Sequence, residues 1–257
     1  MLAPLRDRNP RQCHANESRD WRVYEALAQV LIRKARRLYR EDSNGLDIDE
    51  MVYADACIYD WPVPVDVSVG SFSQTKAAIK LHTQIDLTGS IPVFIKISDG
   101  SVHDVHVMDQ MILEAGSIYV FNRGYLDFSR LFRIESANAF FVIRAKRNIR
   151  FSRCRSRSVD KSCGLRCDQT IRLSTYKGKR DYPGKLRRIR LFDTETRKRL
   201  VFLTNHFDLL AQVILMTSAK ISYTKFRTLP KHVKNFIYLM IFFISSGEHS
   251  WFDPTLA

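Results

Sequence analysis

One aspartate and one asparagine lie at two positions where acidic side chains could bind metal ions. Asp55 lies inside "MVYADACIYDW", residues 51–61, between two alanines. A carboxylate inside a buried strand is costly unless it is paired or binds a metal. Asn122 directly follows the β-branched and aromatic run "IYVF". Carboxylates at both places, joined by a third acid, would hold two Mg²⁺ ions for phosphodiester cleavage. Asn122 supplies only a neutral amide.

Hydrophobic patterns predict the elements that must position these two residues. Apolar residues at steps of three and four predict an amphipathic helix over 20–40. Further helices are predicted over 103–112 and 125–138. Runs of β-branched and aromatic residues predict strands. These strands are residues 51–61, 77–86, 91–98, 117–121 and 139–146. The order of elements predicts an α/β fold with a ribonuclease H-like mixed sheet, in which the strands of Asp55 and Asn122 are neighbours.

The positive charge of the chain is concentrated in one block. The net charge is 41 − 27 = +14, and residues 144–199 contain 20 Lys/Arg and 5 Asp/Glu, a local balance of 20 − 5 = +15. Such a block predicts binding to a polyanion, and nucleic acid is the usual one. A solvated basic surface is the alternative. The same block contains alternating runs that predict an antiparallel β insertion. Candidate phosphate contacts are Arg144, Lys146, Arg147, Arg187, Arg188 and Arg190.

Several motifs together resemble the DDE transposases of bacterial insertion sequences, in the branch with a Y-R-E-K signature around its third acid. "YADACIYD" resembles the strand of the first acid, with Asp55 at the position of the aspartate. "TKAAIKLHTQIDLTGSIP" resembles the hairpin that follows, and "FNRGYLDFSRLF" resembles the motif of the second acid, which reads D-R-G-Y in the family. "CDQTIRL", "RDYPGKLRRIR" and "LVFLTNHF" resemble the β insertion.

The resemblance implies Mg²⁺ as cofactor, with Asp55 as a metal ligand, and DNA as partner, both at the element ends and at the target. It also implies contact with further copies, either as a homo-oligomer or with intact transposases. Two departures predict a truncated or degenerate copy. Asn122 occupies the position of the second acid, and residues 209–236 contain no glutamate that could be the third.

The resemblance divides the chain into four predicted parts. Residues 1–50 form a helical lead-in, 51–149 the ribonuclease H-like catalytic core, 150–207 the basic β insertion, and 208–257 a divergent C-terminus. The most apolar run, residues 236–244, is too short for a bilayer span of about 20 residues, so we expect no membrane association. The odd number of cysteines predicts a reducing compartment, and the family implies a bacterial cytoplasm with association to the nucleoid.

Three functions therefore remain open from the sequence. The first is a transposase that cuts and joins DNA, with impaired chemistry in this copy. The second is a non-catalytic DNA-binding remnant or an inhibitor of intact transposase. The third is a decayed product without a function.

Overall fold

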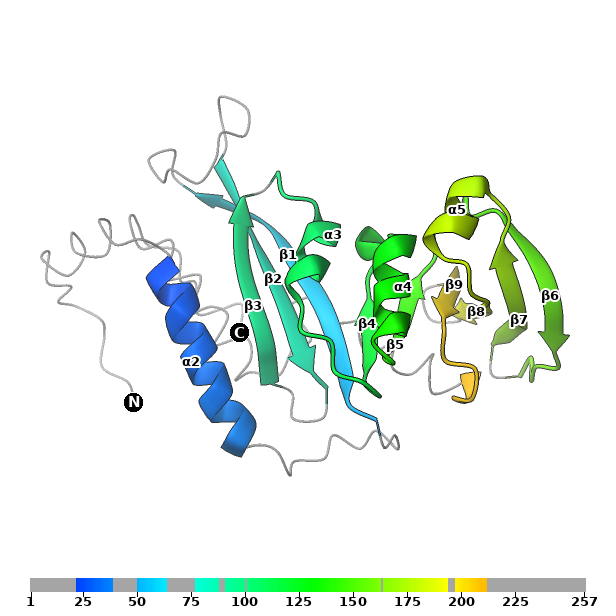
Figure 1. The fold of residues 1–257 in the computed structure, drawn as a ribbon, viewed down its shortest axis with the longest axis horizontal. Helices are drawn as coiled ribbons and strands as arrows, with labels where there is room; N and C mark the ends of the chain where they lie inside the picture. The colour runs from blue at the N-terminus through cyan, green and yellow to red at the C-terminus, as the bar shows by residue number, and fades with distance from the viewer. Residues whose placement is uncertain are drawn as a thin grey trace, which may run out of the picture.

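The computed structural model of the chain describes residues 22–38, 50–63, 77–87, 91–99, 101–162, 164–193 and 197–211. Most of the predicted C-terminal part 208–257 lies outside these residues. The described strands form one nine-stranded sheet, with helices packed against it (Figure 1).

The first five strands have the order β3-β2-β1-β4-β5. β1 (Val52–Val63), β2 (Ala77–Asp86) and β3 (Ile91–Asp99) are antiparallel, whereas β4 (Ile118–Phe121) and β5 (Phe140–Arg144) run parallel to β1. The prediction of a ribonuclease H-like mixed sheet is confirmed, as is the hairpin that joins the second and third strands.

The basic β insertion continues this sheet. β9 (Lys198–Thr204) pairs antiparallel with β5, and β8 (Leu186–Asp193), β7 (Leu165–Leu173) and β6 (Phe151–Arg157) follow in that order. Neither β6 nor the short helix α5 (Tyr176–Asp181) was predicted from the sequence. β6 is an edge strand exposed along most of its length, so it lacks the alternation of apolar and polar residues that marks a half-buried strand.

Alternating side chains build a hydrophobic core on each face of the sheet. On β4, Tyr119 and Phe121 face one core, while Ile118 and Val120 face the other. Leu131 from α4 (Phe128–Ser136) packs into the first core. The second core also contains residues of the insertion, which are Leu165, Ile189, Leu200 and Phe202. The shared cores show why the insertion and the first five strands form one sheet.

Hydrogen bonds position α2 against the sheet and fix where α4 begins. α2 (Arg22–Leu38) packs against β3, and the Gln29 side chain donates a hydrogen bond to the Ile95 carbonyl over 3.0 Å. α4 begins after Asp127, whose carboxylate accepts from the Arg130 backbone N–H. The predicted start at residue 125 was therefore too early. Asn138 follows this helix with φ 56°, a left-handed conformation that asparagine tolerates.

The predicted helix over residues 103–112 was too long. α3 (Asp104–Val107) has one turn, and the 3-10 helix η1 (Met108–Gln110) follows it. Met111 is already extended and buried, with its sulfur 3.8 Å from the Gln84 side-chain nitrogen. The chain leaves the helix at this residue because Met111 packs into the core beneath it.

His82 on β2 should make folding stability depend on pH. Its side chain is buried, and its Nε2 lies 2.9 Å from the Ser98 hydroxyl. Burial lowers the pKa of His82 from 6.5 to about 4, so the unfolded chain binds a proton more readily than the folded chain between these values. The contribution of His82 to the free energy of unfolding should therefore fall, by up to about 3 kcal/mol, as the pH drops from 6.5 to 4, whereas the raised pKa of the buried Asp55 carboxyl acts in the opposite direction.

Chemical denaturation at several pH values measures this dependence. His82→Gln keeps a nitrogen near Ser98 and removes the titration, so the difference in stability between this variant and the wild type should shift in favour of the variant as the pH drops through this range. His103→Gln, at an exposed histidine, is the control and should keep the wild-type profile. An identical pH profile in the His82→Gln protein would contradict the prediction.

Candidate nucleic-acid interface and second-acid position

The strands of Asp55 and Asn122 lie side by side, as predicted. β1 pairs with β4 so that Ala54 lies opposite Val120. Asp55 is therefore in the interior of β1, while Asn122 immediately follows the last residue of β4. The Asn122 side chain is exposed, and its backbone carbonyl accepts the Tyr125 backbone N–H over 3.1 Å.

The Asp55 side chain is buried inside the protein. It is 1% exposed, and the Gln84 side-chain amide donates to its carboxyl oxygens over 3.3 and 3.5 Å. Burial raises the pKa of Asp55 well above its usual value, and the hydrogen bond from Gln84 offsets only part of this effect.

The described residues do not fit the Mg²⁺ that the resemblance implies. Asp55 is desolvated, and Asn122 has no charge. Within the described ranges, no three His, Cys, Asp or Glu side chains come together as metal ligands. Two guanidinium groups, Arg123 and Arg144, are close enough to interact at the end of β4. The charge around position 122 therefore favours an anion over a cation.

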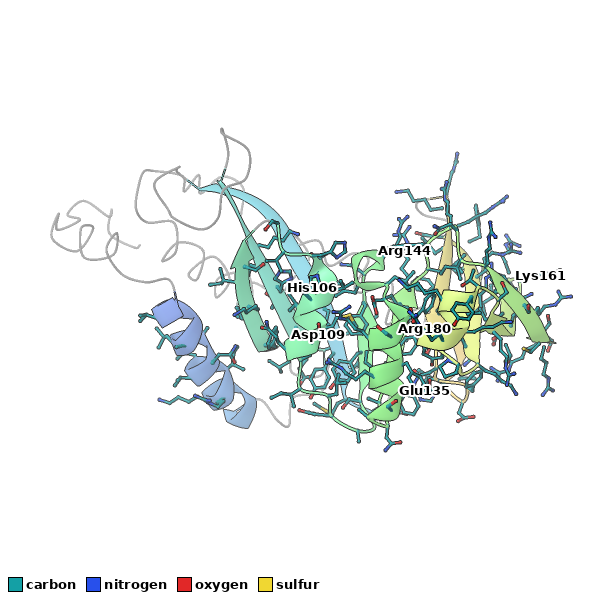
Figure 2. All side chains as sticks on the ribbon, turned by 45° about the horizontal axis from the view of Figure 1, so that its top comes forward. His106, Asp109, Glu135, Arg144, Lys161 and Arg180 are labelled. Atoms are coloured by element: carbon teal, nitrogen blue, oxygen red, sulfur yellow. The ribbon has the colours of Figure 1, made fainter. Side chains whose placement is uncertain are left out.

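Beside Asn122 lies a groove of about 920 Å³, which we call the basic groove. Nine of its lining residues are cationic and none is acidic. The cationic residues are Arg123, Arg144, Lys146, Arg147, Arg188, Arg190, Arg197, Lys198 and Arg199. The apolar lining consists of Ala145, Ile149, Phe151, Val201 and Leu203. Figure 2 labels Arg144 beside the insertion and Lys161 at the far end of the insertion. The groove thus connects the second-acid position to the insertion strands.

Neighbouring side chains hold Arg188 in the groove. Its guanidinium lies over the Phe151 ring, 4.9 Å from the centroid, and donates to the Gln169 side-chain oxygen over 3.0 Å. The other donors of this guanidinium remain available to an anion, because a guanidinium has five N–H groups. A preoriented arginine loses less side-chain entropy when it binds a phosphate.

Five of the six predicted phosphate contacts line the basic groove, and Arg187 does not. β8 alternates, so Arg188 and Arg190 face the groove while Arg187 faces the opposite core with Ile189. Arg187 is 4% exposed and forms an ion pair with Asp168 over 2.7 Å. This placement removes Arg187 from the set of candidate DNA contacts.

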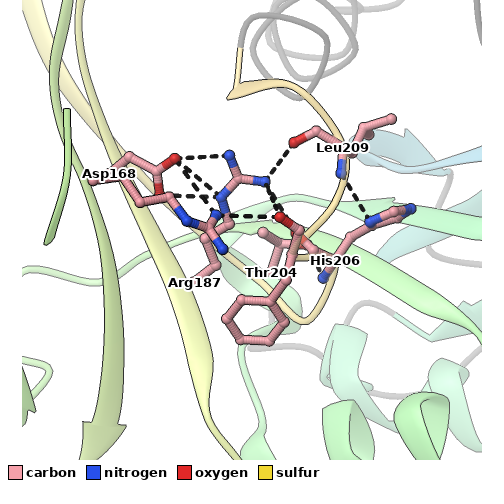
Figure 3. Close-up of polar contacts among 7 residues, drawn as sticks. Asp168, Arg187, Thr204, His206 and Leu209 are labelled. Carbon is pink, nitrogen blue, oxygen red and sulfur yellow. Dashed lines mark hydrogen bonds and ion pairs between the residues drawn. The ribbon is translucent and has the colours of Figure 1, made fainter. Parts of the chain in front are cut away.

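Arg187 instead forms hydrogen bonds that hold the loop after β9 in place (Figure 3). Its guanidinium donates hydrogen bonds to the carbonyl oxygens of His206 and Phe207, each at a distance of 3.2 Å, and to the carbonyl oxygen of Leu209. His206 reinforces this loop, because its Nδ1 accepts the Leu209 backbone N–H over 3.2 Å. The pair of Arg187 and Asp168 is therefore a structural element of the insertion.

Four cations of the groove were not predicted from the sequence. Arg197, Lys198 and Arg199 belong to the basic block, but they were not among the predicted phosphate contacts. Arg123 belongs to the second-acid motif, where Asn122 was the predicted site residue. The regular alternation of side chains along the strands is the signal that could have separated Arg187 from Arg188.

Comparison with known proteins decides the family. The sequence profile of the transposase DDE domain matches residues 69–234, which is more than half of the chain. The chain belongs to the transposase DDE domain family. Asn122 and the basic groove lie inside the match, and Asp55 precedes it. The match also continues past Phe207, where the resemblance was expected to end. Members of this family typically use a divalent metal.

One curated relative of the chain is a putative transposase, y4zB, from Sinorhizobium fredii. It is 31% identical over 115 residues, which are 43% of this chain and 32% of the relative. The aligned part thus spans about a third of the length of that relative.

Two solved structures resemble the chain weakly. One is a piggyBac transposase synaptic complex with hairpin DNA, at 9% identity and a TM-score of 0.41, covering 76% of this chain and 45% of that one. The other is endonuclease V from Bacillus subtilis, at 10% identity and a TM-score of 0.35, covering 82% and 89%. Both scores are too low to support an argument about function. None of the helices in the described ranges is long and apolar enough to cross a membrane.

Proposed function

We propose that this DDE-family chain binds insertion-sequence DNA in the basic groove, as part of DNA transposition, and that its strand cleavage and transfer are impaired. The basic groove carries the proposal, because nine cations and no carboxylate line it. Neutralising phosphates in such a groove releases condensed counterions, which drives binding without regard to sequence. The site of this DNA contact continues to Asn122, the place of the second acid.

Impaired chemistry follows from the residues at the two acid positions. Asn122 lacks the charge of the family aspartate, and Asp55 is buried against Gln84. Losing several kcal/mol of transition-state stabilisation would slow cleavage by more than about 10³-fold, since about 1.36 kcal/mol corresponds to tenfold. The segment in which the family carries its third acid lies outside the described residues.

Incubation of the purified chain with labelled duplex DNA tests both parts of the proposal. At low salt we expect binding, and with Mg²⁺ we expect no more cleavage products than with EDTA. Asn122→Asp alone should not restore cleavage, because residues 209–236 contain no glutamate that could be the third acid. Mg²⁺-dependent cleavage by the wild-type chain would refute the impairment, and absence of binding at low salt would favour a decayed product.

A non-catalytic inhibitor of intact transposase is the second candidate function. The observation that favours it is the combination of an intact basic groove with a neutral second-acid position. Such a chain would occupy the DNA that an active copy must bind. Adding it to an active relative should then reduce transposition in proportion to its DNA binding, and a variant without the groove cations should not inhibit.

A further inference from the structure

The second-acid position has two cationic neighbours. Phe121, the last residue of β4, pairs with Ile143 of β5 in parallel register. Asn122 follows Phe121 and Arg144 is the last residue of β5, so the two residues lie at the neighbouring carboxyl ends of these strands. Arg123 follows Asn122 directly, and both arginines line the basic groove. The exposed Asn122 thus adjoins Arg123 in the sequence and Arg144 at the neighbouring strand end, and we call this place the corner.

No carboxylate neutralises this corner within the described part of the chain. The ion pairs found there involve neither Arg123 nor Arg144. Arg144 is half-buried, and its pKa is lowered first by burial and then by the charge of Arg123. The two cations thus repel each other, and an anion between them would relieve this repulsion.

We propose that Asn122, Arg123 and Arg144 bind a phosphate group of the nucleic acid at the place where active members of the family hold a divalent cation. This inference rests on the proposed binding of DNA in the groove. Guanidinium groups match the oxygens of a phosphate with paired hydrogen bonds. The Asn122 amide adds an N–H donor, which an ionised aspartate lacks. The substitution that removes a metal ligand therefore creates a phosphate ligand.

The proposal predicts that DNA binding does not require Mg²⁺ and that a carboxylate at position 122 opposes it. Fluorescence anisotropy with a labelled duplex at low salt, in EDTA, measures the affinity. Asn122→Asp should weaken binding by at least about fivefold, because it places a negative charge close to a phosphate. Asn122→Ala, which removes only the donor, should weaken binding less. Arg144→Gln should also weaken DNA binding, as Asn122→Asp does.

Asn138→Asp is the matched control, because it makes the same chemical change at an exposed residue that precedes β5, at the opposite end of that strand. It should bind DNA as the wild-type chain does. Wild-type affinity of the Asn122→Asp protein in EDTA, or tighter binding of the wild type with Mg²⁺, would overturn the phosphate site and leave DNA binding intact. If the wild type did not bind at low salt, the proposed function would fail as well.

Discussion

Replacing Arg187 with alanine should lower the free energy of unfolding by about 3–5 kcal/mol, because the buried carboxylate of Asp168 would lose its closest charged partner and keep only Arg157, 3.8 Å away. Arg187 and Asp168 are each 4% exposed, and two guanidinium nitrogens of Arg187 contact the carboxylate over 2.7 to 3.2 Å. The substitution would also deprive three backbone carbonyls of a donor. Urea denaturation followed by circular dichroism measures the change.

Two control variants separate the causes of this destabilisation. Arg180→Ala removes an exposed arginine that pairs with Asp181, and it should change stability by less than about 1 kcal/mol. The double variant Asp168→Leu/Arg187→Met removes both charges, and it should recover part of the stability. Recovery should be incomplete because the carbonyls of His206 and Leu209 stay without the donor that Arg187 supplied. A decrease below about 1 kcal/mol in Arg187→Ala would show that the pair does not stabilise the insertion.

Removing three groove cations should weaken DNA binding on the order of 100-fold at low salt, about 1 kcal/mol for each cation. The variant is Arg144→Ala/Arg188→Ala/Arg190→Ala, which takes one cation from β5 and two from β8. The fold should persist, because none of the three occupies a hydrophobic core in the described structure. Fluorescence anisotropy with a labelled duplex measures the affinity.

The matched control removes the same amount of charge outside the groove. Lys161→Ala/Lys177→Ala/Arg180→Ala changes three exposed cations, so both triple variants have a net charge of 14 − 3 = +11. The control should retain much more of the affinity. Equal weakening in the two variants would mean that net charge, and not the groove, determines binding.

Adjacent residues 187 and 188 show what the sequence could and could not predict. "KLRRIRLFD" predicts a strand with basic residues, and the structure confirms β8. The sequence shows two neighbouring arginines with equal charge and does not show which face of the sheet is open. Packing decides this, because the face of Arg187 is closed by Ile189 and the loop after β9.

The positions of the first five strands along the chain could be predicted, because each hydrophobic run and each turn signal is local. The length of the helix at residues 103–112 could not, because Met111 ends it through contact with β2, which is distant in sequence. For Asp55, the cost of burying a carboxylate predicted either a paired side chain or a metal, and the family resemblance implied the metal. The structure places a different partner there, the Gln84 amide, which offsets part of that cost.

The salt dependence of DNA binding tests the central claim most directly. Wild-type chain and the groove variant Arg144→Ala/Arg188→Ala/Arg190→Ala are titrated into labelled duplex DNA at increasing salt concentrations. We expect the logarithm of the wild-type binding constant to fall linearly with the logarithm of salt concentration. The slope of the variant should be smaller by about 3, one for each phosphate that is no longer neutralised. Binding that is indifferent to salt, or a slope that the groove variant shares with the wild type, would contradict the claim that DNA lies in the basic groove.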